Sequence, residues 1–360
     1  MADCDVAGEG NHFVHPKYQL RNAVRWLIGA ILLIGIASIA FLVDRSGKLS
    51  GRIVYVKNVY GGYGGVYSMD PEGNDVTNLT SSCIIRPIAP AWSPDGKLIA
   101  FGCHLADDTP TLCVMGEEGM QRPDCFKYTG WVDPERMAEE FCTSSLDAVS
   151  WAPDGQRLAI ACPYQSTPGD PVEERICIIT LAGGGNCWPV SKISAEVLTG
   201  GDASVDWSPV EDRLALSLVS LETGYQTLIY LVDPDGRNSV LLAEGRDPSW
   251  SPDGGRLAFF RNGMYLIDQD GSNLEPVYQF SSEPPVHETP FWDQNPDPKP
   301  GFTSKASWSP NGRFAAFSGS LSPSGGHLGI YIVDLKTKEV WRITDFYDGA
   351  YSDPDWSFGD

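Results

Sequence analysis

The chain has 360 residues and a formal net charge of −21. Residues 1–25 carry three acidic and three basic side chains, so the whole acidic excess lies after them. An excess of this sign disfavours nucleic acid and anionic lipid as partners and is typical of a solvated protein surface.

An apolar segment of about 20 residues runs from residue 24 to residue 43, with Arg25 as its one charge near the start. This length spans a bilayer as a helix. A cleaved signal peptide is the alternative, but Leu42, Val43 and Asp44 do not form the small-residue site at which signal peptides are cut. The sequence therefore predicts a cytoplasmic tail at 1–23, a transmembrane signal-anchor helix at 24–43, a linker at 44–50 and an ectodomain at 51–360.

Basic residues flank the apolar segment on both sides, so their distribution does not decide its orientation. The cysteines do decide it. Cys4 precedes the segment and eight cysteines follow it, and an even number on one side favours disulfides in an oxidising compartment. We therefore expect the ectodomain on the extracytoplasmic side of a membrane, whether at a cell surface, in a periplasm or in a lumen.

Six tryptophans recur after the linker in nearly the same local sequence, with separations of 59, 56, 43, 58 and 48 residues. They are Trp92, Trp151, Trp207, Trp250, Trp308 and Trp356. Most are followed by Ser-Pro-Asp-Gly or Ser-Pro-Asn-Gly, a turn in which Pro presets φ and Gly supplies a positive φ. Three further strands follow before the next tryptophan. Four antiparallel strands in such a repeat are typical of one propeller blade.

The last repeat stops at Asp360, directly after its tryptophan. Its missing strands are found at the start of the ectodomain, over 51–80, where three strand-like segments have no tryptophan strand before them. We therefore predict an all-β, six-bladed propeller in which the C-terminal strand is the innermost strand of a blade completed by 51–80. Such closure removes exposed sheet edges.

The Trp-Ser-Pro-Asp-Gly pattern, followed by an Ile-Ala-Phe-like strand and an Asp-x-Asp-Gly turn, resembles the TolB-type, WD-like β-propellers. The resemblance covers about residues 51–360 and implies the fold. It does not imply the function, because such propellers serve as binding modules, as accessory domains of enzymes and as enzyme scaffolds. TolB itself has an additional α/β domain before its propeller, for which residues 1–50 leave no room.

Two adjacent units carry the same four-cysteine pattern, in which one cysteine lies nine residues before the tryptophan and the next eleven after it. The predicted disulfides are Cys83–Cys103, Cys113–Cys125, Cys142–Cys162 and Cys177–Cys187. The alternative joins the second cysteine to the third and the first to the fourth in each unit.

Catalytic and ligand-binding motifs are absent from the sequence. It contains no G-x-S-x-G nucleophile elbow, no Walker A or G-x-G-x-x-G motif, and no H-E-x-x-H or C-x-x-C metal site. The turn at Asp268 resembles the start of a calcium loop, but Gln279 stands where the closing Glu belongs. We expect no cofactor, no metal and no enzymatic activity.

Charged residues precede several of the tryptophans, where the innermost strands enter the central channel. We refer to this side of the ring as the entry face. Two long loops, 126–141 and 281–304, are expected on the same face, and exposed aromatic residues in them favour a contact role. The candidate ligand-binding residues are Trp131, Phe291, Trp292, Arg246, Asp247, Lys305, Asp353 and Asp147. Asp206 and Asp355, next to their tryptophans, are assigned to hydrogen bonds within the blades.

The sequence thus predicts a membrane-tethered binding or scaffolding propeller that contacts a protein, a peptide or a cell-wall glycan through its entry face. The alternative is a carbohydrate- or peptide-active enzyme, a lyase or hydrolase, with its site in the central channel.

Overall fold

The computed structural model describes residues 49–58, 64–80, 85–104, 110–119, 146–165, 170, 172–194, 203–220, 226–279, 305–319, 328–344 and 349–357. Residues Leu49–Asp360 form one compact unit. The predicted tail and membrane span lie outside the described residues. Within the described ranges, no helix is long and apolar enough to cross a membrane.

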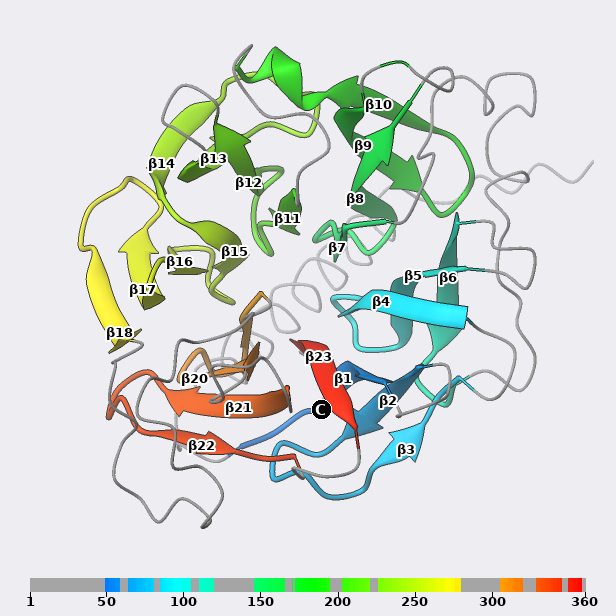
Figure 1. Ribbon diagram of the computed structural model, residues 1–360, viewed down its shortest axis with the longest axis vertical. Helices are drawn as coiled ribbons and strands as arrows, with labels where there is room; N and C mark the ends of the chain where they lie inside the picture. The colour runs from blue at the N-terminus through cyan, green and yellow to red at the C-terminus, as the bar shows by residue number, and fades with distance from the viewer. Residues whose placement is uncertain are drawn as a thin grey trace, which may run out of the picture. The chain divides into compact units, whose positions relative to one another are not determined.

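Six antiparallel sheets stand around a central axis and form a six-bladed β-propeller, as the repeats predict (Figure 1). Blade 1 consists, from the axis outward, of β23 (Ala350–Trp356), β1 (Ile53–Asn58), β2 (Gly65–Met69) and β3 (Thr77–Asn78). Blade 2 shows three strands among the described residues: β4 (Ile85–Trp92), β5 (Leu98–His104) and β6 (Pro110–Gly116).

The other four sheets each have four strands. Blade 3 consists of β7 (Ala148–Trp151), β8 (Arg157–Tyr164), β9 (Glu173–Thr180) and β10 (Gly185–Pro189), which the short 3-10 helix η2 (Val190–Lys192) follows. Blade 4 consists of β11 (Ser204–Trp207), β12 (Leu214–Ser220), β13 (Gln226–Val232) and β14 (Val240–Glu244). Blade 5 consists of β15 (Arg246–Trp250), β16 (Arg256–Phe260), β17 (Gly263–Asp268) and β18 (Glu275–Gln279). Blade 6 consists of β19 (Ser307–Trp308), β20 (Phe314–Gly319), β21 (Gly329–Asp334) and β22 (Val340–Arg342).

Both ends of the propeller segment close the ring in blade 1, as predicted. The innermost strand β23 pairs antiparallel with β1, and Figure 1 shows the two side by side near the axis. The Trp356 indole is fully buried, and its N–H donates to the Ser50 carbonyl at 2.7 Å. The Ser357 N–H donates to the Arg52 carbonyl at 2.8 Å. The polypeptide therefore enters and leaves the propeller at the end of the channel where the tryptophans lie.

Local sequence accounts for the recurrent turn between the first two strands of a blade. In blade 2, the Ser93 hydroxyl donates to Asp95 at 2.7 Å and accepts the Leu98 N–H at 2.9 Å. Gly96 adopts φ +69°, which a residue without Cβ tolerates best. Ser251 with Asp253 in blade 5, and Ser309 with Asn311 in blade 6, repeat the serine bonds. We refer to the side of the ring that carries these turns as the turn face.

The hydrophobic core is divided among the six junctions between blades. Each of the six buried clusters combines side chains of two adjacent blades, so the series of clusters closes around the ring. The repeated tryptophan of every inner strand belongs to one of them. Burial of a large side chain contributes about 1.5–3 kcal/mol, so the tryptophans stabilise the packing of blade against blade.

The inner strands are of two kinds. In blades 1, 2 and 5, the third residue before the tryptophan precedes a proline and has a positive φ: Asp353 at +51°, Ala89 at +46° and Asp247 at +54°. Extra residues shift the register of these strands against the next strand, once in blades 1 and 5 and twice in blade 2, and each shift defines a β-bulge. The inner strands of blades 3 and 4 pair without such a shift.

The disulfides agree with the predicted pairing in one blade and differ from it in the other. Cys177 and Cys187 are joined, because the register of β9 and β10 places them directly opposite one another. Cys103 is joined to Cys113, as in the alternative pairing, so the predicted pairs Cys83–Cys103 and Cys113–Cys125 are wrong. Phe101 lies opposite Cys113, which makes Cys103 its diagonal neighbour on the same face of the sheet. Cys162 is disulfide-bonded, whereas Cys83, Cys125 and Cys142 lie outside the described residues.

Candidate functional site

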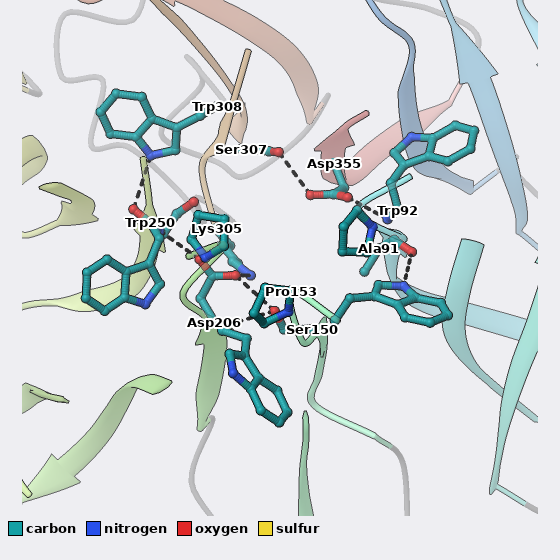
Figure 2. Close-up of a pocket in the computed structure, with 15 residues that line it drawn as sticks. Ala91, Trp92, Ser150, Pro153, Asp206, Trp250, Lys305, Ser307, Trp308 and Asp355 are labelled. Carbon is teal, nitrogen blue, oxygen red and sulfur yellow. Dashed lines mark hydrogen bonds and ion pairs between the residues drawn. The ribbon is translucent and has the colours of Figure 1, made fainter. Parts of the chain in front are cut away.

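The central channel contains a cavity at its tryptophan end, with an empty volume of about 630 Å³ that reaches open solvent (Figure 2). Residues of all six inner strands or their turns line it. They include five of the repeated tryptophans, the prolines Pro94, Pro153 and Pro209 of the turn face, and the residues directly before the tryptophans. These last are Asp355, Ala91, Ser150, Asp206, Ser249 and Ser307 in blades 1 to 6. Lys305 completes the charged lining.

Asp206 in blade 4 connects the inner strands of four blades. Its Oδ2 accepts the Trp250 N–H of blade 5 at 2.7 Å. Its Oδ1 accepts the Ser150 hydroxyl of blade 3 at 3.1 Å and an ion-pair hydrogen bond from Lys305 of blade 6. Ser150 in turn accepts the Trp207 N–H at 3.0 Å. This carboxylate therefore accepts three donors from three other blades.

Asp355 in blade 1 makes the same two neutral contacts on the other side of the channel. Its Oδ2 accepts the Trp92 N–H of blade 2 at 2.7 Å, and its Oδ1 accepts the Ser307 hydroxyl of blade 6 at 2.9 Å. Ser307 accepts the Trp356 N–H at 2.8 Å. Both carboxylates thus connect blades, and the assignment of their hydrogen bonds to their own blades is wrong.

The two carboxylates differ in their charge partners. Lys305 crosses the channel to Asp206 and also donates to the Val205 carbonyl at 3.3 Å. No ion pair to Asp355 occurs among the described residues. Burial raises the pKa of Asp355 to about 6, and the nearby Asp206 charge acts in the same direction. Lys305, the Trp92 N–H and the Ser307 hydroxyl oppose this shift.

The indole N–H groups divide the tryptophans into two sets. Trp151 donates to the Ala91 carbonyl at 2.9 Å and Trp308 donates to the Ser249 carbonyl at 3.1 Å, in each case to the preceding blade. The Nε1 atoms of Trp92, Trp207 and Trp250 are buried and have no hydrogen-bond partner among the described residues. These three tryptophans line the cavity. Unsatisfied buried donors are rare in proteins.

At the entry face, two aspartates occupy equivalent bulge positions. Asp247 of blade 5 forms an ion pair with Arg246 at 3.1 Å, and its N–H donates to Ser217 Oγ at 3.3 Å. Asp353 of blade 1 accepts the Ser352 hydroxyl at 3.0 Å. Burial raises the pKa of Asp353, while that hydroxyl and the Ala89 N–H oppose the shift. The bulges hold both carboxylates on fixed backbone.

The candidates from the sequence therefore fall into three groups. Lys305 lines the cavity, while Asp147, Arg246, Asp247 and Asp353 lie at the strand entries and do not line it. Trp131, Phe291 and Trp292 are outside the described residues. Sequence reasoning missed the paired roles of Ser150 and Ser307. The signal was present, since both occupy the position directly before a repeated tryptophan.

The polar groups of the cavity are hydrogen-bonded to one another. Both oxygens of each cavity carboxylate already accept hydrogen bonds, and each serine hydroxyl donates to its aspartate. Among the described parts of the chain, no group of three His, Cys, Asp or Glu side chains is placed to hold a metal ion.

Comparison with known proteins identifies the fold but not the family. No family model and no curated protein matches the chain. TolB from Acinetobacter baumannii is similar in structure, with a TM-score of 0.60 and 17% identity over 88% of this chain and 69% of that one. The protein of Agrobacterium tumefaciens assigned as TolB has a TM-score of 0.53 and 16% identity, over 84% of this chain and 92% of that one.

A chain of hydrazine synthase from Kuenenia stuttgartiensis matches with a TM-score of 0.54 and 11% identity. The match covers 87% of this chain and 48% of that one. At these identities the likeness establishes a TolB-like β-propeller fold and nothing finer.

Proposed function

We propose that this protein is a membrane-tethered, extracytoplasmic binding propeller that holds a protein, peptide or cell-wall glycan partner on its entry face. The Trp-Ser-Pro repeats and the TolB-like fold support a place among the TolB-type propellers. The observation that carries the binding role is the pair of bulges that present Asp247 and Asp353 on fixed backbone. Groups already held in place lose little conformational entropy when a partner binds.

The disulfides found among the described residues support an oxidising, extracytoplasmic location.

Site-specific photocrosslinking tests which face binds the partner. A photoreactive residue is placed at Arg246, on the entry face, or at the exposed Glu211, on the turn face. We expect partner adducts from position 246 and few from position 211. Asp247→Asn should reduce the adducts at 246, with a melting temperature close to that of the wild type. Adducts confined to position 211 would reject the entry face.

An enzyme with its site in the central channel is the second candidate. One observation favours it: the pKa of Asp355, raised to about 6 by burial, is suited to a general acid. A panel of glycan and peptide substrates tests this candidate. Turnover that Asp355→Asn abolishes, while the fold is retained, would replace the binding role with catalysis.

A further inference from the structure

The channel has an internal two-fold repeat. Blades 3, 4 and 5 correspond to blades 6, 1 and 2, in that order. Ser150 and Ser307 correspond, as do Asp206 and Asp355, and so do the Trp250 and Trp92 N–H groups that these carboxylates accept. Each half is thus a serine, an aspartate and a backbone N–H from three consecutive blades.

The two halves differ at one charged position. Lys305 lies three residues before Trp308 in blade 6, and its ammonium group binds Asp206 Oδ1. The corresponding residue of blade 3, three before Trp151, is Ala148. Asp206 therefore has a lysine across the channel, whereas the sequence position that corresponds for Asp355 holds an alanine, which packs in the core between blades 3 and 4.

Asp355 retains the capacity to accept another donor. A carboxylate offers about four lone-pair sites, and Asp355 uses one on each oxygen, for Trp92 and for Ser307. In the other half, the serine-bonded oxygen of Asp206 also takes the lysine. The oxygen of Asp355 that accepts Ser307 is thus the counterpart of the one that binds Lys305, and Asp355 is among the residues that line the open cavity.

From this asymmetry we propose that the Asp355 half of the cavity is a subsite for one primary alkylammonium group, of the kind that a lysine side chain carries. The group would approach from the turn face, where Pro94 and Pro153 line the cavity. A guanidinium fits less well, because its planar fork favours both oxygens of a carboxylate and each oxygen of Asp355 already accepts a donor. This subsite is independent of the proposed entry-face function, since the two lie at opposite ends of the channel.

The test measures binding of small probes to the full-length purified protein by ligand-observed NMR. The probes are N-acetyl-lysine methylamide, its arginine analogue, and the uncharged N-acetyl-norleucine methylamide. We expect saturable binding of the lysine probe, weaker binding of the arginine probe and none of the norleucine probe. Equal binding of the norleucine probe would overturn the proposal.

Two variants locate the probe. Asp355→Asn keeps the size of the side chain, and we expect it to weaken lysine-probe binding at least about tenfold. Glu211→Gln is the matched control: it removes a carboxylate that is exposed on the turn face and does not line the cavity, and it should leave the affinity within about twofold of wild type. If Asp355→Asn retained wild-type affinity, the subsite would not exist.

The pH dependence gives an independent measurement. The carboxylate must be ionised to bind, and the charged groups that face it in the cavity are Lys305 and Asp206. With a pKa of about 6 for Asp355, affinity should fall about tenfold from pH 7.5 to pH 5. Unchanged affinity over this range would contradict ionic binding.

A further arm separates the two sources of such a group. Binding of n-butylamine as tight as that of the lysine probe would assign the subsite to free amines. Tighter binding of the lysine probe would assign it to a lysine within a peptide. Either result supports the subsite itself.

Discussion

Two sets of three consecutive blades, 3–5 and 6, 1 and 2, are joined at the channel by the same hydrogen bonds but differ in the charge around their aspartate. In both halves an aspartate before a tryptophan accepts a serine from the preceding blade and a tryptophan N–H from the following one. In the first half Lys305 neutralises the aspartate, and in the second the aspartate has no such partner among the described residues. The comparison separates what the ring needs for closure from what it leaves available for binding.

The shared contacts are structural, since they connect strands that have no backbone pairing with each other. An unpaired N–H in the narrow centre of a propeller would carry a desolvation cost, and the aspartates accept two such groups. The unshared lysine is not required for closure, because blade 1 closes without one. The difference between the halves is therefore where we place the ligand subsite.

The largest expected effect on stability comes from removing the innermost strand of blade 1. Deleting residues 351–360 removes most of the innermost strand β23, with the buried Trp356 and Tyr351. Loss of one buried large aromatic side chain costs about 3–5 kcal/mol, and the native state as a whole is stable by about 5–15 kcal/mol. We expect no cooperative unfolding transition in a urea titration.

The matched control for this deletion removes residues 358–360, which leaves β23 intact. It should unfold cooperatively, with a midpoint close to that of the wild type. A wild-type melting temperature in the longer deletion would show that blade 1 does not depend on its C-terminal strand.

The next effect compares the two aspartates directly. Asp206→Ala removes the acceptor of three donors and leaves Lys305, whose side chain is 27% exposed, without its ion-pair partner. We expect a loss of about 2–4 kcal/mol. Asp355→Ala removes the acceptor of two donors and also a poorly solvated charge, so its loss should be smaller, about 1–2 kcal/mol. Urea unfolding at pH 7.5 measures both.

A double variant checks whether the lysine causes the difference. In Asp206→Ala with Lys305→Met, no unpaired ammonium remains, and the loss should approach that of Asp355→Ala. Equal losses in the two single variants would mean that the lysine does not distinguish the halves.

The half of the channel that contains Asp355 should contribute more to the pH dependence of stability than the half that contains Asp206. The pKa of Asp355 is about 6 in the folded protein and close to 3.8 when unfolded, so the folded state binds more protons between these values. This carboxyl therefore lowers the free energy of unfolding as pH rises from about 4 to 6, by on the order of 1–3 kcal/mol.

Comparison with Asp355→Asn isolates this contribution from the other titrating groups. As pH rises from 4 to 7, the free energy of unfolding of the wild type should fall relative to that of the variant. A difference that is constant with pH would contradict the raised pKa.

The fold was predictable because its signals are local and repeated. The tryptophan turn recurs with its serine and glycine, and the unpaired repeat at Trp356 has its complement at 51–80, so blade number and closure followed from the sequence. The disulfide partner of Cys103, which is Cys113 and not Cys83, was harder to predict from the sequence. It depends on the diagonal relation of residues on β5 and β6, and the spacing of cysteines along the chain does not specify that relation.

The cavity was predictable only in part. Lys305 was identified as a charged residue near the channel, but its partner Asp206 lies 99 residues away in sequence. The equivalence of blades 3–5 with blades 6, 1 and 2 emerges from contacts between blades, and no single repeat contains it. The sequence indicated which residues lie near the channel, but it did not indicate which of them contact one another across blades.

The smallest expected effect concerns the bulges that distinguish the inner strands. Ala89 in blade 2 has φ +46°, a conformation that costs a residue with a Cβ about 1–2 kcal/mol, whereas Ala148 in blade 3 holds the same place before its tryptophan without a positive φ. Ala89→Gly relieves this strain but adds about 0.5–1 kcal/mol of unfolded-state entropy, so we expect a gain of up to about 1 kcal/mol.

Ala148→Gly is the control, because it has the entropic cost and loses a buried methyl group without any strain to relieve. It should lower the free energy of unfolding by about 0.5–1 kcal/mol. Urea titrations of the two variants should therefore move in opposite directions from the wild type. A loss of stability in Ala89→Gly as large as that in Ala148→Gly would mean that the bulge before Trp92 is not strained, and that the two kinds of inner strand do not differ in energy at this position.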